Sequence, residues 1–454
     1  MTRPALLVAL QTAVVAAILA CVLLLAARAP WRLDLTPERR FTISPHTREV
    51  LRRLAGKGRI AITAFYSGQE AAIRREMADL LALYRDAAPW LEVRLLDLDR
   101  SPGAAERLGV RNYNVAVVEA PAPGGGTRRE QVPLVNEDTL TAALLETAGM
   151  PTMPLYFVLG HGEPDPRDDE GREGAGDAAR ALALDGFEVR PLAGAASIPG
   201  DAGLVVLAGP SRDLRPPEVE ALAGFVRGGG RLLVLTDPGT PPSVRALLAG
   251  FGIEPGDDVV IDVQARLFGT DGLAARVAYL NQQIVPQLPE VEALLPVAQT
   301  LRLVDAPGVS ADYLAVTSEG TWADVDRRAL GGAVPAFRRG TDRAGPLPVA
   351  VLARIAGGDG REGRLGTIGD ADFATNLHLG VLGNRDLLLL VADLVARDGA
   401  IAAPRRPPAP QGRFSALFLT AREARLVFWV SVAGPGTVLA AAAMVAARRR
   451  RRQG

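Results

Sequence analysis

The sequence predicts an α/β protein whose two domains lie between two membrane-spanning helices. Two apolar stretches without charges, Ala5–Ala27 and Leu426–Ala447, are each more than twenty residues long. At ~1.5 Å per residue, each is long enough to cross a ~30 Å hydrocarbon core. Between them, short apolar strand-like runs alternate with segments of helical periodicity. Such alternation is typical of α/β folds.

Positive charges predict the orientation of the chain in the membrane. Arg448–Arg452 directly follow the second apolar stretch, and cytoplasmic flanks are rich in Lys and Arg. Two crossings then place both termini in the cytoplasm and the main body in the periplasm, at an inner (cytoplasmic) membrane. Arg28, Arg32, Arg39 and Arg40 follow the first stretch and favour the reverse, but long domains translocate largely regardless of such charges. A cleaved signal peptide is less favoured, because the stretch exceeds the usual apolar region of about 7–15 residues.

The first domain, expected over residues 58–150, shows the element order β-α-β-α-β-β-α. The expected strands are 59–66, 91–98, 114–119 and 129–135, and the expected helices are 71–87, 102–108 and 140–148. Asn136 or Asp138 can cap the last helix. This order is that of a thioredoxin-like domain. Redox exchange is excluded, because Tyr66-Ser67-Gly68-Gln69 occupies the dithiol position and the single cysteine, Cys21, lies in the first apolar stretch.

The second domain, expected over residues 151–400, reads as an open, mostly parallel sheet of flavodoxin/amidotransferase-like type. The expected strands are 155–159, 188–192, 203–208, 231–236, 258–263, 349–355 and 364–368, and the expected helices are 175–184, 217–227, 244–251 and 386–396. Residues 265–345 lose this rhythm, which indicates an irregular insertion. The remaining segments are an N-terminal anchor (1–30), a juxtamembrane segment (31–57), a proline-rich linker (401–425), the second membrane helix (426–447) and a basic cytoplasmic tail (448–454).

Four polar turns follow predicted strands of the second domain, and parallel sheets bind ligands at this edge. If the topology holds, the turns bring together a rim of His161, Glu163, Asp237, Asp370 and Asp372, with Asn376 nearby. Such a rim could bind a divalent cation, a cationic group or a protein partner. The ordinary interpretation is that Gly and Asp are the residues that turns and helix caps need. Ser211 with His161 could form a hydrolytic pair, although no G-x-S-x-G elbow surrounds it.

The composition argues against nucleic-acid binding and excludes ATP hydrolysis through a P-loop. The chain carries 51 basic and 51 acidic residues, so no global field favours nucleic acid. Lys57 is the only lysine and lies outside any G-x-x-x-x-G-K-[ST] motif, which excludes a P-loop ATPase. Neither a cofactor nor a structural metal is expected.

Several short motifs together resemble a known family. They are Arg32-Leu33-Asp34-Leu35-Thr36, Arg40-Phe41-Thr42-Ile43-Ser44, Gly160-His161-Gly162-Glu163 and Gly369-Asp370-Ala371-Asp372-Phe373 with Asn376. With the C-terminal membrane helix, they resemble the auxiliary subunits of gliding-motility-type ABC transporters. The resemblance implies a non-enzymatic component that works with a separate ATPase and permease, with its body outside the inner membrane. The alternatives are a membrane-anchored periplasmic hydrolase, or a ligand- or metal-binding sensor, each using the rim around His161 and Asp370.

Overall fold

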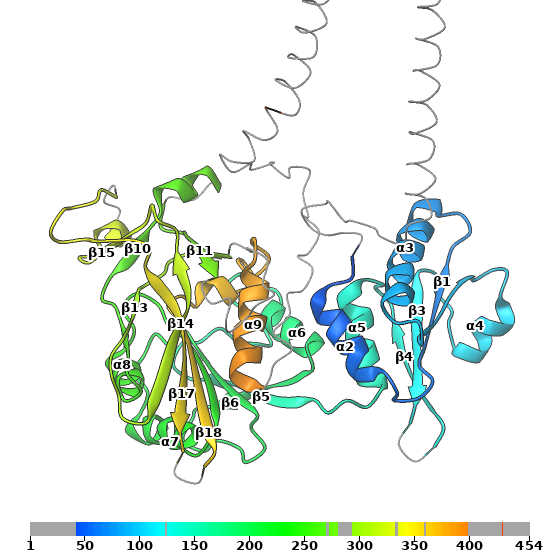
Figure 1. The fold of residues 1–454 in the computed structure, drawn as a ribbon, viewed down its shortest axis with the longest axis horizontal. Coiled ribbons are helices and arrows are strands. Elements are labelled where there is room, and N and C mark those ends of the chain that lie inside the picture. Colours follow the sequence, from blue (N-terminus) through cyan, green and yellow to red (C-terminus); the bar gives the residue numbers. More distant parts are fainter. Residues whose placement is uncertain are drawn as a thin grey trace, which may run out of the picture. The chain divides into compact units, whose positions relative to one another are not determined.

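The computed structural model describes residues 42–397 except 123–124, 269–271, 280–292, 332–334 and 358–359, and in addition Trp429 (Figure 1). The predicted membrane helices, 5–27 and 426–447, lie outside the described residues apart from Trp429. Among the helices within the described ranges, none is both long and apolar enough to cross a membrane.

Residues 45–147 form a four-stranded sheet with four helices. The elements are α2 (Pro45–Leu54), β1 (Ala61–Tyr66), α3 (Ala71–Ala87), β2 (Glu92–Asp97), α4 (Pro102–Leu108), β3 (Val115–Pro121), β4 (Thr127–Val132) and α5 (Glu137–Thr147). The strands lie in the order β2-β1-β3-β4. β2 is parallel to β1, whereas β3 is antiparallel to both β1 and β4. The element order predicted for this part of the chain is therefore confirmed.

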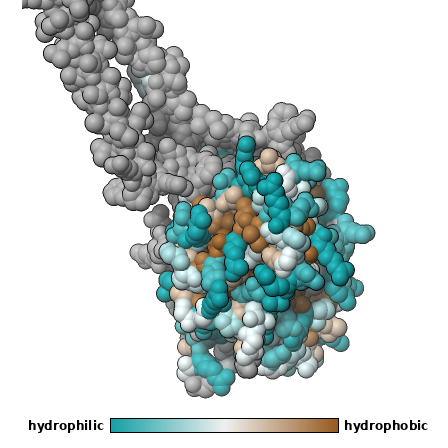
Figure 2. All heavy atoms as spheres, turned by 90° about the vertical axis from the view of Figure 1, so that its right-hand side faces the viewer, coloured by the Kyte–Doolittle hydropathy of each residue, from teal (hydrophilic) through white to brown (hydrophobic). Residues whose placement is uncertain are grey.

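Helices cover both faces of this sheet. One core lies between the sheet and α2, α3 and α5, and a smaller one lies between the sheet and α4. Asn136 caps α5, because its side chain accepts the Thr139 amide at 2.9 Å. Helix α2 was not predicted; the Ser44 hydroxyl caps it by accepting the Thr47 amide at 3.1 Å. Much of the surface is hydrophilic, with one apolar patch on the side shown in Figure 2.

The second sheet has nine strands in the order β12-β11-β14-β17-β18-β8-β7-β5-β6. Its main elements are β5 (Met153–Leu159), α6 (Gly176–Leu184), β6 (Phe187–Ala193), β7 (Leu204–Ala208), α7 (Pro216–Arg227), β8 (Arg231–Leu235), α8 (Pro242–Ala249), β17 (Pro348–Ala356), β18 (Glu362–Ile368) and α9 (Asn384–Ala396). β18, β8, β7, β5 and β6 are parallel. The rest of the sheet is antiparallel, so the sheet is mixed rather than mostly parallel.

Alternation along the parallel strands sends side chains into two cores. Phe157, Val206 and Leu233 pack in the core that contains α6 and α9. Val158, Val205 and Leu232 pack in the core that contains α7 and α8. Because both faces are covered, these strands are continuous apolar runs, as expected of parallel strands.

Residues 265–345 contain more regular structure than the sequence pattern indicates. They include η1 (Val263–Phe268), β11 (Ala275–Tyr279), β12 (Ala293–Leu295), β13 (Leu301–Leu303), β14 (Val309–Thr317), β15 (Trp322–Asp324), η2 (Arg328–Gly331) and β16 (Arg343–Ala344). β14, β11 and β12 extend the large sheet beyond β17. β9 (Ile253–Pro255) pairs with β13, and β10 (Val259–Ile261) pairs with β15.

Candidate functional site

The turns that carry the predicted rim residues lie at the edge where β5, β7, β8 and β18 end. These strands are parallel neighbours, so the turns that follow them lie side by side. The Ser211 and Arg212 amides, after β7, donate to the carbonyl of His161, after β5, at 2.9 and 3.0 Å. The Ala371 amide, after β18, donates to Asp237 Oδ1, after β8, at 2.7 Å. The convergence of these turns therefore holds in the structure.

His161 is held on both sides by carboxylates. The histidine is buried, with 7% of its surface exposed to solvent. Nδ1 lies 3.1 Å from Glu163 Oε1, and Nε2 lies 3.0 Å from Oε2 of Glu218 on α7. Glu218 also accepts from the Arg215 guanidinium at 2.8 Å and from the Ala195 amide at 3.3 Å. The hydrogen bond from the Arg215 side chain lowers the pKa of Glu218 to about 2.

Ser211 is not paired with the His161 ring. Its hydroxyl donates to the main-chain carbonyl of His161 at 3.2 Å, while both ring nitrogens already lie against carboxylates. The turn is tight, because Gly162 has φ of 98° and a Cβ there would collide with Ser211 Oγ. A nucleophile needs a base within hydrogen-bond reach, and this arrangement gives Ser211 no such contact with His161.

Asp237 and Asp370 form a second group, in which each carboxylate accepts hydrogen bonds from main-chain amides of neighbouring segments. Asp370 is fully buried and accepts the Val297 amide at 2.7 Å and the Phe373 amide at 2.9 Å. Burial raises the pKa of Asp237 to about 7. Burial, followed by the nearby charge of Asp237, raises the pKa of Asp370 well above its ordinary range. Burial and the proximity of the two charges thus favour the neutral, protonated form of these carboxyl groups.

Asp372 and Asn376 take different positions. Asp372 is exposed at the start of η3 (Asp372–Ala374). Asn376 Nδ2 donates to the carbonyls of Asp168 and Gly171, both at 2.7 Å. Its Oδ1 accepts the Asp177 amide at 2.8 Å, in the first turn of α6. Asn376 therefore clamps the acidic loop before α6.

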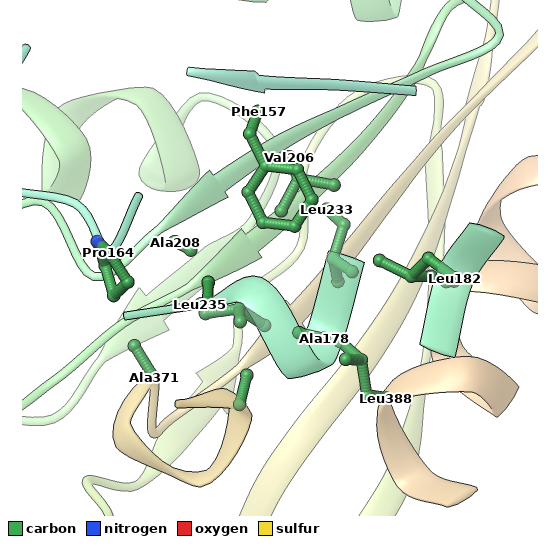
Figure 3. Close-up of a pocket in the computed structure, with 13 residues that line it drawn as sticks. Phe157, Pro164, Ala178, Leu182, Val206, Ala208, Leu233, Leu235, Ala371 and Leu388 are labelled. Atoms are coloured by element: carbon green, nitrogen blue, oxygen red, sulfur yellow. The ribbon is translucent and has the colours of Figure 1, made fainter. Parts of the chain in front are cut away.

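The cavity beneath the rim is apolar and very small. Its volume is about 10 Å³, close to the minimum that holds one water. Figure 3 shows side chains from β5, β7, β8, α6 and α9 around it. The lining residues are Phe157, Pro164, Ala175, Ala178, Leu182, Val206, Ala208, Leu233, Leu235, Ala371, Ala374, Leu388 and Ala392. This cavity is a packing void and has no room for a substrate.

No metal centre is evident in the ranges that the structure describes: no three His, Cys, Asp or Glu side chains there are arranged to hold an ion. Sequence reasoning also missed two partners of the rim. Glu218 lies 57 residues from His161, and Val297 lies 73 residues from Asp370. The sequence does mark Glu218 as a helix-capping residue, because it is the third residue of a helix that begins Pro216-Pro217. That local signal does not indicate that Glu218 also contacts His161.

Comparison with known proteins identifies the family. A family model described as an ABC-type uncharacterized transport system, the ABC transporter auxiliary family, matches residues 154–389. The match covers more than half of the chain. The chain belongs to this family.

The part matched by the ABC transporter auxiliary family runs from β5 into α9 and contains all six predicted rim residues. A second family model, of a domain of unknown function, matches residues 37–122, which include β1 to β3. A search of curated proteins found no match. The family assignment supports an accessory subunit of an ABC transport system.

Three solved structures are similar to parts of this chain at low sequence identity. An "mmIFT52 N-terminal domain" is 16% identical, with coverage of 54% of this chain and 98% of its own, and a TM-score of 0.39. A putative ThuA-like protein from Parabacteroides merdae is 12% identical, with coverage of 54% and 90% and a TM-score of 0.33. The Trx4 domain of ERdj5 is 15% identical, with coverage of 24% and 96% and a TM-score of 0.18.

Proposed function

We propose that the protein is a non-catalytic accessory subunit of an ABC-type transport complex of the gliding-motility type. It acts as a periplasmic scaffold or coupling component for a separate permease and ATPase. Membership of the ABC transporter auxiliary family supports the accessory role. The motifs around Arg32–Thr36 and Arg40–Ser44 support the gliding-motility type.

The observation that carries the non-catalytic role is the hydrogen bonding of the rim. His161 lies between two carboxylates, Asp370 holds two amides, and Asn376 holds a loop. Buried polar groups that are already paired would lose those bonds before they could bind a substrate. The hydrolase alternative is weakened by the Ser211 hydroxyl, which bonds to the main chain of His161 rather than to its ring.

We also propose the following arrangement of the chain. Residues 5–27 and 426–447 span the inner membrane, both termini are cytoplasmic, and the body is periplasmic. Residues 58–150 form a thioredoxin-like domain without a dithiol, supported by the strand order β2-β1-β3-β4. Residues 151–400 form a flavodoxin/amidotransferase-like domain, supported by its five parallel strands. Two anchors would keep the body at high effective concentration beside a permease in the same membrane.

Co-purification tests this function. The tagged full-length protein, cross-linked in its membrane and extracted in mild detergent, is expected to bring down a P-loop ATPase and a multi-span permease in comparable amounts. An unrelated two-span membrane protein with the same tag controls for non-specific capture. If the chain is recovered alone after cross-linking, the proposed function is wrong. Metal analysis and hydrolase assays on the same sample then address the alternatives.

A further inference from the structure

The described chain is built around two sheets with separate apolar cores. Residues 45–147 surround the four-stranded sheet and residues 153–396 surround the nine-stranded sheet; we call them the small-sheet part and the large-sheet part. None of the buried apolar clusters in the described ranges contains residues of both parts. Residues 148–152 connect the two parts, with Gly149 at φ of 66° and with Pro151 exposed. A short exposed connection of this kind can serve as a hinge.

Charged side chains link the two parts. Asp138, in the first turn of α5, accepts a hydrogen bond from the Arg385 guanidinium of α9 at 2.6 Å. His46 Nε2, on α2, lies 3.6 Å from Oδ1 of Asp185, which directly follows α6. Both His46 and Asp185 are buried. Interfaces between parts of a chain that are polar rather than apolar usually permit relative movement.

Helix α9 presents a stripe of ionisable residues to this interface. Asp386 and Asp393 are two helical turns apart, and Arg397 follows one turn later, so all three lie on one side of the helix. Charges of the small-sheet part act on both acids: Asp138 acts on Asp386, and Arg53 of α2 acts on Asp393. Arg397 donates to Asp393 Oδ1 at 2.7 Å. Both carboxyl groups therefore lie toward α2 and α5.

The closed interface disfavours the ionised form of these two acids. Asp386 is 6% exposed, and neither of its carboxyl oxygens has a hydrogen-bond partner among the described residues. A buried charge without such partners is costly. Burial raises the pKa of Asp386 to about 7, and burial likewise raises the pKa of Asp393 to about 7. Both groups thus bind a proton more tightly when the interface is closed than when they face water.

We propose that the contact of α9 with α2 and α5 is a proton-dependent latch, which holds the two parts together while Asp386 and Asp393 are protonated and opens as they ionise. In water an aspartic acid has a pKa of about 4. Opening should therefore become more favourable as pH rises from about 4 to about 7, by up to about tenfold per pH unit for each group.

Six further titratable or charged groups face this interface. They are His46, Arg53, Asp138, Asp185, Arg385 and Arg397. The arginines stay charged over this pH range, so they favour the ionised carboxylates and reduce the release without reversing its direction. The latch does not depend on the proposed transport role.

Thiol labelling of the full-length protein in detergent measures the opening. With Cys21→Ala as background, Leu390→Cys places a thiol one turn after Asp386, at a position that is 7% exposed. Val234→Cys, at a fully buried position of β8, reports unfolding of the large sheet. Rates are divided by that of a free cysteine at the same pH. Labelling at position 390 should exceed that at position 234 and should rise about 100-fold from pH 5 to pH 8. Equal labelling of the two positions would overturn the proposal, because the interface would then open only on unfolding.

Substitution of Asp386 assigns the pH dependence to the latch. Asp386→Asn imitates the protonated carboxyl group, so the rise in labelling of Leu390→Cys should shrink by at least about tenfold. Asp372→Asn is the matched control: its exposed carboxyl group also has a raised pKa but lies on η3, and the full rise should remain. Unchanged protection of Val234→Cys shows that the variants are folded. A rise that Asp386→Asn leaves intact, or the lack of any rise without it, would overturn the proposal.

Discussion

Replacing Asn376 with alanine should loosen the loop before α6 without unfolding the large sheet. The Asn376 side chain makes three hydrogen bonds, at 2.7, 2.7 and 2.8 Å, to main-chain groups that lie about 200 residues earlier in the chain. Alanine removes all three and keeps the bond from its own amide to the Gly174 carbonyl. The loop is then held by fewer long-range contacts.

The expected size follows from those bonds. A protein hydrogen bond contributes about 1 kcal/mol net. Asn376 is partly exposed, so water replaces some of the lost bonds, and we expect the local opening free energy to fall by about 2 kcal/mol. This corresponds to roughly 30-fold faster exchange of the Asp177 amide. Gly174→Ala should act in the same direction, because a Cβ there would meet Asn376 Nδ2 at 2.8 Å.

The assay is hydrogen exchange of the full-length protein, read at Asp177 and across the loop. Asp372→Ala is the matched control, since this exposed side chain lies in the same turn. Its exchange should equal that of the native chain. A change of less than about threefold at Asp177 in Asn376→Ala would refute the clamp, because three lost bonds cannot cost so little.

Three further predictions concern buried groups, each read from urea unfolding of the full chain in detergent. Burial raises the pKa of Asp386 to about 7, so this carboxyl group should lower the free energy of unfolding as pH rises from about 4 to about 7. Asp386→Asn should remove this group's share of the fall, while Asp237 and Asp370 keep theirs, and it should stabilise the chain at pH 8 by up to about 4 kcal/mol. The pKa of Glu218 is lowered to about 2, so this group should make the native chain less stable as pH falls below about 4.5. Glu218→Gln should weaken this acid dependence, while Glu49, whose pKa is also lowered to about 2, still contributes to it. Ala178→Leu should cost about 1–3 kcal/mol, because the cavity of about 10 Å³ cannot take three more carbon atoms. Unaltered pH profiles, or no loss in Ala178→Leu, would contradict the respective explanations.

Local signals were sufficient for the elements with strong periodicity or clear caps. α3 and α4 begin and end where the sequence predicts. In α4, Pro102 occupies the first turn and Gly109 ends the helix with φ of 69°, which are the residues that helix starts and stops favour. Buried parallel strands such as β7 and β8 are short apolar runs, and they too lie close to their predicted bounds.

The elements that sequence reasoning missed depend on distant partners. β12, β13 and β15 are three residues long, too short for an alternation to be read. Their conformation is set by pairing with β11, β9 and β10. Helix α2 begins at Pro45 beside a cap whose amide bonds to Glu137, 93 residues away. Tertiary contacts of this kind leave no local pattern.

The rim shows why the position of polar residues was predictable and their role was not. Strand ends and turns can be read from sequence, so the convergence of His161, Asp237 and Asp370 at one edge follows from topology. Whether such groups are free for a ligand depends on their partners. Here those partners are Glu218 on α7, the Val297 amide near β12 and the Ala371 amide after β18. A ligand-binding edge and a set of turns held together by hydrogen bonds have the same residue types in the same positions. The hydrogen-bond partners distinguish the two, and here they favour a structural role for these residues. An accessory subunit would then make its contacts through other surfaces of the protein.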